Sequence, residues 1–214
     1  MESLTFDIET RPQQGKLSEI QEAELAKKLG RYLERHSQAD KDEARRLIMG
    51  TSPFFGEIVV IGLLKEVNGE TDTLAISGTE TEILTRFWDI AGKHRGVFIS
   101  YNGLTFDVPF IINRSLKHRT PPSSADFINT RRYSKYPHFD VKEVIADWDR
   151  FAAPTLRLAC ELTGVESPKE GEVKAEDVEK VSLQPGGIKK IADYCIRDVQ
   201  STYEVYKKLQ GYWV

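Results

Sequence analysis

Apolar positions in the first half of the chain alternate or form short runs that predict strands. Leu4 to Ile8 is a short strand, and Ile58 to Leu64 is a near-continuous β-branched run, typical of a strand covered on both faces. Asn68-Gly69 is a strong hairpin-turn signal, so Thr71 to Ile76 is expected to pair with the preceding run. Val97 to Ser100 predicts a fourth strand.

From Thr79 onward, most apolar positions have helical spacing. After the N-cap candidate Thr79, apolar residues recur on one face as far as Gly92, and another helix is expected from about Phe106 to Leu116. Leu156 to Leu162 and the closing segment Ile188 to Leu209 also have a helical period. This order predicts an α/β fold in which helices flank a mixed sheet.

Three segments are less regular. The charged stretch from about Leu17 to Met49 predicts one or two surface helices, which we interpret as an insertion in a single domain spanning residues 1–214. Arg119 to Pro137 is rich in proline and serine and predicts a long loop. Phe139 to Val144 is compatible with a fifth strand or with the start of a helix.

Composition bounds the class of protein. With 214 residues, 40% of them apolar, the chain is long enough for one buried core, and no apolar run approaches the length of a membrane span. Cys160 and Cys195 lack the spacing of a disulfide framework or a zinc site. A strand begins directly at the N-terminus and leaves no room for a signal peptide, so we expect a cytoplasmic protein.

The charge is unevenly distributed. The formal net charge is −3, yet basic residues outnumber acids strongly between Ile111 and His138, where Asp126 is the single acid. Tyr133 and Tyr136 are interleaved with the cations, a combination that suits phosphates and stacked bases. The basic residues of this segment are Arg114, Lys117, Arg119, Arg131, Arg132 and Lys135.

Asp7 and Glu9 occupy alternate positions of the first strand and therefore project from the same face, about 6.6 Å apart along it. Two such acids need cations unless solvent reaches them, and oxygen ligands suit magnesium or manganese. The pattern alone is weak, because the same spacing recurs at Asp177 and Glu179 without a strand around it. The alternative is a solvated strand end.

Two further motifs carry acids. Asn102 and Asp107 lie between the end of the fourth strand and the start of the next helix, where ligands collect in α/β sheets. Tyr194 and Asp198 are four residues apart in the closing helix and share a face. Each motif has a simpler explanation, a helix cap for the first and a half-buried tyrosine beside a solvated aspartate for the second. Their joint occurrence on suitable elements favours one shared site.

These motifs resemble those of a known family. Phe6 to Thr10 (FDIET), Tyr101 to Asp107 (YNGLTFD) and Tyr194 to Asp198 (YCIRD) are similar to the three exonuclease motifs of the DEDD superfamily, tyrosine subgroup (DEDDy). The wider chain resembles the stand-alone bacterial exonucleases related to the proofreading domain of family B DNA polymerases. The resemblance implies an RNase H-like fold with a five-stranded mixed sheet. No polymerase domain is expected in cis.

The resemblance also implies roles for residues. Two divalent ions, magnesium or manganese, would be held by Asp7, Glu9, Asp107 and Asp198, and Tyr194 would place the attacking water. Thr10 and Asn102 resemble positions near the terminal nucleotide, and Phe106 is expected under the site or against a base. Asp140 lies in a motif-like stretch, but the quartet is complete without it. Arg131 and Arg132 are candidates for gripping the strand behind the reacting end.

The predicted activity is 3′-to-5′ exonucleolytic hydrolysis of nucleic acid, with single-stranded DNA as the expected substrate and nucleoside monophosphates as products. Two alternatives remain open at this point. One is an RNA-trimming exoribonuclease with the same chemistry, because the motifs do not discriminate a 2′ hydroxyl. The other is a catalytically silent nucleic-acid-binding or protein-interaction module that keeps the fold.

Overall fold

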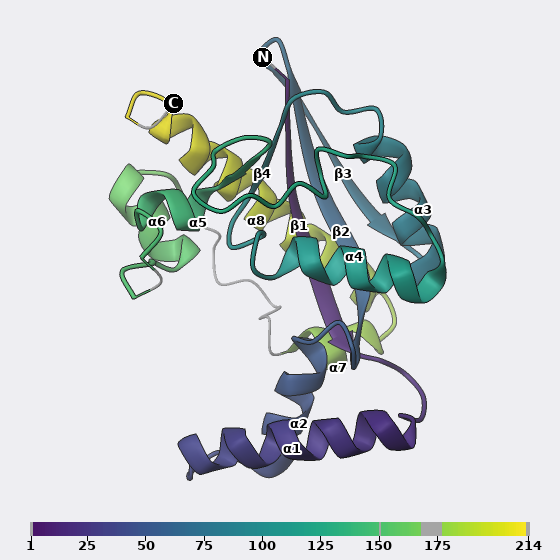
Figure 1. Ribbon diagram of the computed structural model, residues 1–214. Coiled ribbons are helices and arrows are strands. Elements are labelled where there is room, and N and C mark those ends of the chain that lie inside the picture. The colour runs from purple at the N-terminus through teal and green to yellow at the C-terminus, as the bar shows by residue number, and fades with distance from the viewer. Residues whose placement is uncertain (1, 150, 168–176, 213–214) are drawn as a thin grey trace.

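A central five-stranded sheet organises the computed structural model, which describes residues 2–149, 151–167 and 177–212. The strand order is β3-β2-β1-β4-β5, as the ribbon in Figure 1 shows. The four strands predicted from the sequence pattern form together with a fifth, and the mixed sheet flanked by helices confirms the RNase H-like fold that the resemblance implied. The strands are β1 (Ser3–Pro12), β2 (Gly56–Val67), β3 (Glu70–Ser77), β4 (Val97–Ser100) and β5 (His138–Asp140).

The sheet combines both pairing types. β2 pairs antiparallel with β1 and with β3, whereas β4 pairs parallel with β1 and with β5. The pairing of β1 with β4 ends at Thr5 opposite Ile99, so the second half of β1 is free of a strand on that side. The register of β1 against β2 shifts between Glu9 and Thr10, the kind of irregularity that re-aims side chains at a strand end.

Helices cover both faces of this sheet (Figure 1). α3 and α4 pack on one face against the cluster of Leu4, Phe6 and Ile8, while α8 covers the other face with help from α5, α6 and α7. The side chains of β1 alternate between the two cores, which is why Asp7 and Glu9 face α8. The helices are α3 (Glu80–Ala91), α4 (Asp107–His118), α5 (Val141–Ile145), α6 (Leu156–Thr163), α7 (Val178–Ser182) and α8 (Gly187–Leu209).

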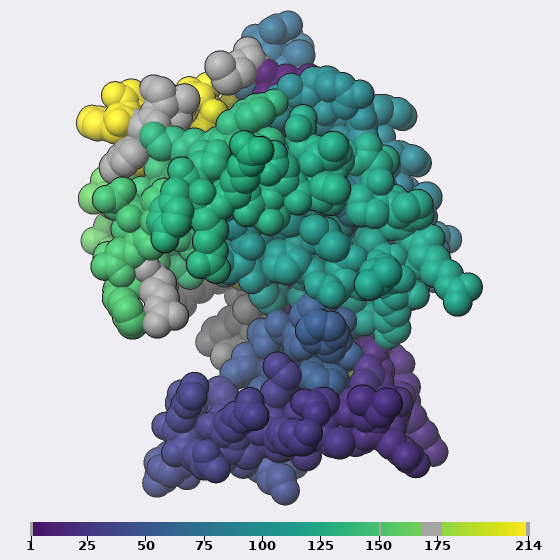
Figure 2. All heavy atoms as spheres, viewed as in Figure 1, coloured from purple at the N-terminus to yellow at the C-terminus, as the bar shows by residue number. Residues whose placement is uncertain are grey.

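The charged stretch after β1 forms two helices, α1 (Glu19–Arg35) and α2 (Lys41–Gly50), which confirms the expected helical segment. In Figure 2 they form a separate layer, purple and blue, below the body of the molecule. Ser18 and Gln21 form a capping box at the start of α1, and Leu25 and Leu29 are the buried residues of that helix. An ion pair between Arg45 and Glu22 joins the two helices.

Several local expectations need correction. The expected loop at 119–137 contains no helix or strand, but its Phe127 is fully buried among the rings of Phe6, Phe87 and Phe98, so this loop also fills the core. The ambiguous segment at 139–144 is both a three-residue strand and the helix α5. α7 was not expected. It contains Glu179 of the second acid pair, and residues 168–176 of that charged stretch lie outside the described residues.

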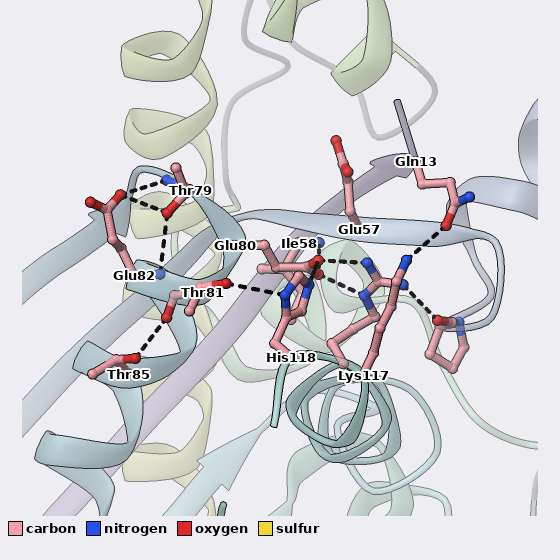
Figure 3. A network of polar contacts seen from close by, with 12 residues as sticks. Gln13, Glu57, Ile58, Thr79, Glu80, Thr81, Glu82, Thr85, Lys117 and His118 are labelled. Carbon is pink, nitrogen blue, oxygen red and sulfur yellow. Dashed lines mark hydrogen bonds and ion pairs between the residues drawn. The ribbon is translucent and has the colours of Figure 1, made fainter. Parts of the chain in front are cut away.

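Arg114 was expected to grip nucleic acid, and the structure contradicts this. Its side chain is 1% exposed and forms a two-pronged ion pair with Glu80 at the start of α3. Glu80 also accepts the backbone N–H of Ile58 at 2.8 Å and contacts His118 (Figure 3). Arg114 further donates to the carbonyl of Pro53. This network fixes the far end of α4 to β2 and to the chain after α2.

Gly62 allows α8 to lie close to the sheet. It pairs with Asp7 in the ladder, and a Cβ atom at Gly62 would lie 2.7 Å from the sulfur of Cys195 and 3.1 Å from Val199. Real Cβ atoms are not found so close to a buried neighbour, so a larger residue would push the helix away. The missing side chain therefore sets the distance between α8 and the part of β1 that contains Asp7.

Among the described residues, no helix has the length and apolar character needed to cross a lipid bilayer. The longest helix, α8, contains charged residues throughout and buries one face against the sheet.

The Glu80 network predicts a large effect on stability. Arg114→Met should lower the free energy of unfolding by about 3–5 kcal/mol in urea denaturation, because it leaves Glu80 buried without its guanidinium partner. Burial raises the pKa of Glu80, but Arg114, the Ile58 N–H and His118 outweigh burial and hold that pKa below its ordinary value. The stabilisation is therefore present at neutral pH and is lost as acid protonates Glu80.

The control is Lys189→Met, which breaks an exposed pair with Asp193 and should change stability little. An Arg114→Met loss no larger than that of the control, or one that persists at low pH, would contradict the assignment.

The close approach at Gly62 gives a second prediction. Gly62→Ala should lower the free energy of unfolding by about 1–3 kcal/mol, because the added methyl group overpacks the interface between α8 and the sheet. Gly30→Ala is the matched control. Gly30 lies in α1 with no atom within 4 Å of an added Cβ, so alanine should stabilise the helix there by about 1 kcal/mol. Equal stability of the Gly62→Ala variant and the wild type would refute the packing account.

Candidate active site

β1 brings the first two acids to the sheet face that α8 covers. Glu9 is 7% exposed and has no hydrogen-bond partner among the described residues, while Asp7 is partly buried. A buried carboxylate without a donor is costly, because the charge loses its hydration and gains nothing in exchange. The environment of Glu9 thus favours a positively charged ligand.

Asp107 joins them from α4. It is the first residue of that helix, and its Oδ1 accepts the backbone N–H of Ile8 at 3.0 Å. This N–H lies on the stretch of β1 beyond its pairing with β4, so the carboxylate replaces a missing strand partner. This hydrogen bond fixes the start of α4 beside Ile8, which lies between Asp7 and Glu9 in β1.

α8 supplies the remaining two groups, Tyr194 and Asp198, one helical turn apart on the same face. The Tyr194 hydroxyl lies near the Asp198 carboxylate and opposes the rise that burial causes in the pKa of that carboxyl. Burial raises the pKa of Tyr194 above its ordinary value, and the charges of Asp198 and Glu9 raise it further. The phenol therefore stays protonated and acts as a hydrogen-bond donor.

The four carboxylates perturb one another. Burial raises the pKa of Asp7 well above its ordinary value, and Asp107, Glu9 and Asp198 raise it further. Burial and the charges of Asp198 and Asp107 likewise raise the pKa of Glu9. Burial raises the pKa of Asp107 to about 7, although the Ile8 N–H opposes this, and burial raises that of Asp198 to about 6. Among the described residues, Asp7, Glu9 and Cys195 have ligand atoms within 4.8 Å of one another, and Asp107 and Asp198 lie near enough to raise the pKa of both acids.

This group of side chains fits hard divalent cations. Four carboxylates carry a formal charge of −4 when ionised, which two divalent ions would neutralise, and oxygen ligands suit magnesium or manganese. Cys195 belongs to the same group as Asp7 and Glu9, with its sulfur 3.4 Å from Oδ2 of Asp7. Burial and the charges of Asp7 and Glu9 raise the pKa of that thiol, so it stays protonated and donates to Asp7 instead of offering a thiolate. This contact was not predicted from the sequence.

Asp140 shapes the loop that leads to Asp107. It is fully buried, caps α5, and accepts the backbone N–H groups of Asn102 at 2.9 Å and Leu104 at 3.0 Å. Asn102 has a positive φ of 68°, and its side-chain oxygen accepts bonds from Thr105 and from the ammonium group of Lys142. Lys142, for which no role was predicted from the sequence, places a positive charge beside Asn102.

The other expected site residues have different surroundings. Thr10 donates its hydroxyl to the carbonyl of Gly50 at 2.7 Å, so this group is engaged with the end of α2. Phe106 packs against the core cluster under α4, with its ring 5.6 Å from that of Phe110. Arg131 and Arg132 are exposed on the segment between α4 and β5. Contacts of these four residues with a substrate stay predictions.

Comparison with solved structures identifies a similar fold. The family B DNA polymerase from the hyperthermophilic archaeon Pyrobaculum calidifontis superposes with a TM-score of 0.64 at 18% identity, covering 98% of this chain and 24% of that polymerase. Two curated sequences are also similar, the DNA polymerases of Thermococcus aggregans (27% identical over 180 residues) and Thermococcus litoralis (26% identical over 180 residues). Each of these matches covers 72% of this chain and 10% of the relative.

The similarity thus concerns a minor part of much longer proteins, about a tenth of the curated relatives. A family match covers more of this chain, residues 55–212, and is described as "Predicted 3'-5' exonuclease related to the exonuclease domain of PolB". The match includes Asp107, Tyr194 and Asp198 and begins after α2. The chain belongs to this family of exonucleases related to the exonuclease domain of PolB.

Proposed function

We propose that this chain hydrolyses single-stranded nucleic acid, preferentially DNA, from the 3′ end and releases nucleoside monophosphates. The observation that carries the proposal is the convergence of Asp7, Glu9, Asp107 and Asp198 from β1, α4 and α8, with the Tyr194 hydroxyl beside them. Membership in a family of 3′-to-5′ exonucleases gives the reaction class.

The four carboxylates would hold two magnesium or manganese ions. Bound there, the ions would supply Lewis acidity toward the scissile phosphate, lower the pKa of the attacking water and stabilise the leaving 3′ oxygen. The chain's own contribution is to keep the acids in place before the ions arrive. The Ile8 N–H and the Cys195 thiol each orient one carboxylate, Asp107 and Asp7 respectively.

Tyr194 would position the attacking water. Because its hydroxyl stays protonated, it cannot accept the water's proton, and it acts through its hydrogen bonds. Asp198 lies one helical turn further along α8, on the same face as Tyr194. Tyr194 would therefore orient the water and leave its acidification to the ions.

The terminal nucleotide would lie against the loop between β4 and α4. The Asn102 side-chain oxygen is occupied by Thr105 and Lys142, so its NH₂ group is directed to other acceptors. A sugar or phosphate oxygen of the substrate is a suitable acceptor, and the ammonium of Lys142 adds a favourable charge. Asp140 keeps this loop in place through the backbone N–H groups of Asn102 and Leu104.

Matched 5′-labelled oligonucleotides of single-stranded DNA and RNA test the proposal directly. With magnesium, the DNA should shorten from its 3′ end in single-nucleotide steps, and EDTA or Asp7→Ala should abolish this. Faster digestion of RNA would replace the DNase with the exoribonuclease alternative. Binding without any cleavage would identify a silent module.

The role of Tyr194 gives a separate prediction. Tyr194→Phe should lower kcat by roughly 100-fold, because the attacking water loses its orientation while the carboxylates remain. Mn²⁺ affinity measured by calorimetry should stay unchanged, since no metal ligand is removed. The control is Tyr212→Phe, an exposed tyrosine beyond the end of α8, which should match the wild type. Unchanged turnover in Tyr194→Phe would remove this residue from the mechanism.

A further inference from the structure

Two aromatic residues meet at the surface although they come from different loops. The rings of Tyr133, between α4 and β5, and Trp148, after α5, lie 5.3 Å apart at an interplanar angle of 56°. Tyr133 is 75% exposed, so most of its ring surface is available to a ligand. In Figure 2 the teal-green segment that contains Tyr133 lies on the face of the molecule toward the viewer.

The backbone at both positions is strained. Tyr133 has φ 61° and Trp148 has φ 63°, values that bulky residues rarely adopt, and Asp147 has φ 49°. α5 ends in a turn in which the Trp148 N–H donates to Glu143 at 2.8 Å, a position where glycine is ordinarily favoured. Strain of this kind is held at sites where the side chain has a use. Here the two residues with strained backbone are the ones whose rings contact each other.

This pair lies close to the catalytic loop. Trp148 follows α5, a helix of five residues that spans about 7.5 Å, and Asp140 caps the start of that helix. The same Asp140 binds the backbone of Asn102 and Leu104 at the carboxylate site. The rings are therefore about one short helix away from the loop beside which the terminal nucleotide is proposed to lie.

Two cations belong to the same segment as Tyr133. Arg131 and Arg132 are exposed and directly precede Tyr133 in the chain. Within the part of the chain that the structure describes, neither guanidinium has an ion-pair partner. Arginine contacts phosphates and also stacks on bases, whereas aromatic rings stack on bases of any sequence. The combination is suited to a flexible strand with unpaired bases and less to a duplex, whose bases are already stacked.

We propose that Tyr133 and Trp148, with Arg131 and Arg132, form a stacking site for an unpaired nucleobase of the strand leading away from the reacting 3′ end. This inference deepens the proposed nuclease function and rests on it for the direction of the strand. The rings hold the base, and the guanidinium groups hold the adjoining phosphates. Such a site explains a preference for single strands without base-specific hydrogen bonds.

Fluorescence anisotropy in EDTA, where cleavage cannot interfere, tests the stacking site on the full chain. The probes are a labelled single-stranded oligo(dT) and an oligonucleotide of equal length with abasic residues at the second to fifth positions from the 3′ end. Both carry the same phosphates, so only base contacts distinguish them. The wild type should bind the abasic probe roughly 5-fold to 100-fold more weakly.

Tyr133→Gly and Trp148→Gly remove the rings at positions whose positive φ suits glycine, so the fold is retained. Each variant should lose most of the preference for the base-bearing probe, whereas Tyr212→Gly, at an exposed tyrosine elsewhere, should keep it. Equal affinity of the wild type for both probes would overturn the proposal, as would an undiminished preference in both variants.

The outcomes separate the two proposals. Hydrolysis of oligo(dT) by a wild type that shows no base preference would refute the stacking site alone. A base preference that depends on Tyr133 and Trp148, in a chain that fails to cleave, would support the stacking site and refute the nuclease.

Discussion

The crowding of like charges is the constraint on which the whole arrangement depends. Burial raises the pKa of Asp7 and Glu9 well above their ordinary values, and repulsion between these two acids, Asp107 and Asp198 adds to the effect. The folded chain must therefore hold these carboxylates together with interactions made elsewhere. A divalent cation pair would turn that repulsion into attraction.

The holding interactions come from neutral donors and close packing. The backbone N–H of Ile8 binds Asp107, the thiol of Cys195 binds Asp7, and the missing side chain of Gly62 lets α8 approach the sheet. At its other end, α4 is fixed by the buried pair of Arg114 and Glu80. None of these groups would bind the ions, yet each limits how far a ligand can move. The candidate site is thus built on the sheet and on two of the helices that cover it, α4 and α8, a rigid setting that suits chemistry dependent on geometry.

Local patterns were sufficient to predict most elements and to single out acidic side chains that influence one another in the structure. The alternation in β1 indicated that Asp7 and Glu9 share a face, and the helical period indicated that Tyr194 and Asp198 do so too. The family resemblance then joined segments that pattern alone could not place side by side. What could not be predicted depends on contacts distant in sequence. The sequence suggested that Arg114 is a surface cation, because its partner Glu80 belongs to a different helix and could not be identified from the sequence.

The same reason explains the other differences. Phe127 lies in a segment whose proline and serine content indicated a surface loop, but the core has a gap that its ring fills. The contact between Tyr133 and Trp148 depends on two turns with positive φ. Tyrosine and tryptophan rarely adopt positive φ, so neither residue predicts such a turn. In the sequence, Cys195 is an apolar position of a helix. Its sulfur comes close to Asp7 because Gly62, on β2, has no side chain to keep α8 away.

The most direct test of the central claim is anomalous diffraction from crystals of the full chain soaked in Mn²⁺. The account predicts two manganese peaks among the carboxylate oxygens of Asp7, Glu9, Asp107 and Asp198, with the sulfur of Cys195 outside the coordination sphere. Carboxylates that point apart with no ion between them, at saturating Mn²⁺, would contradict it.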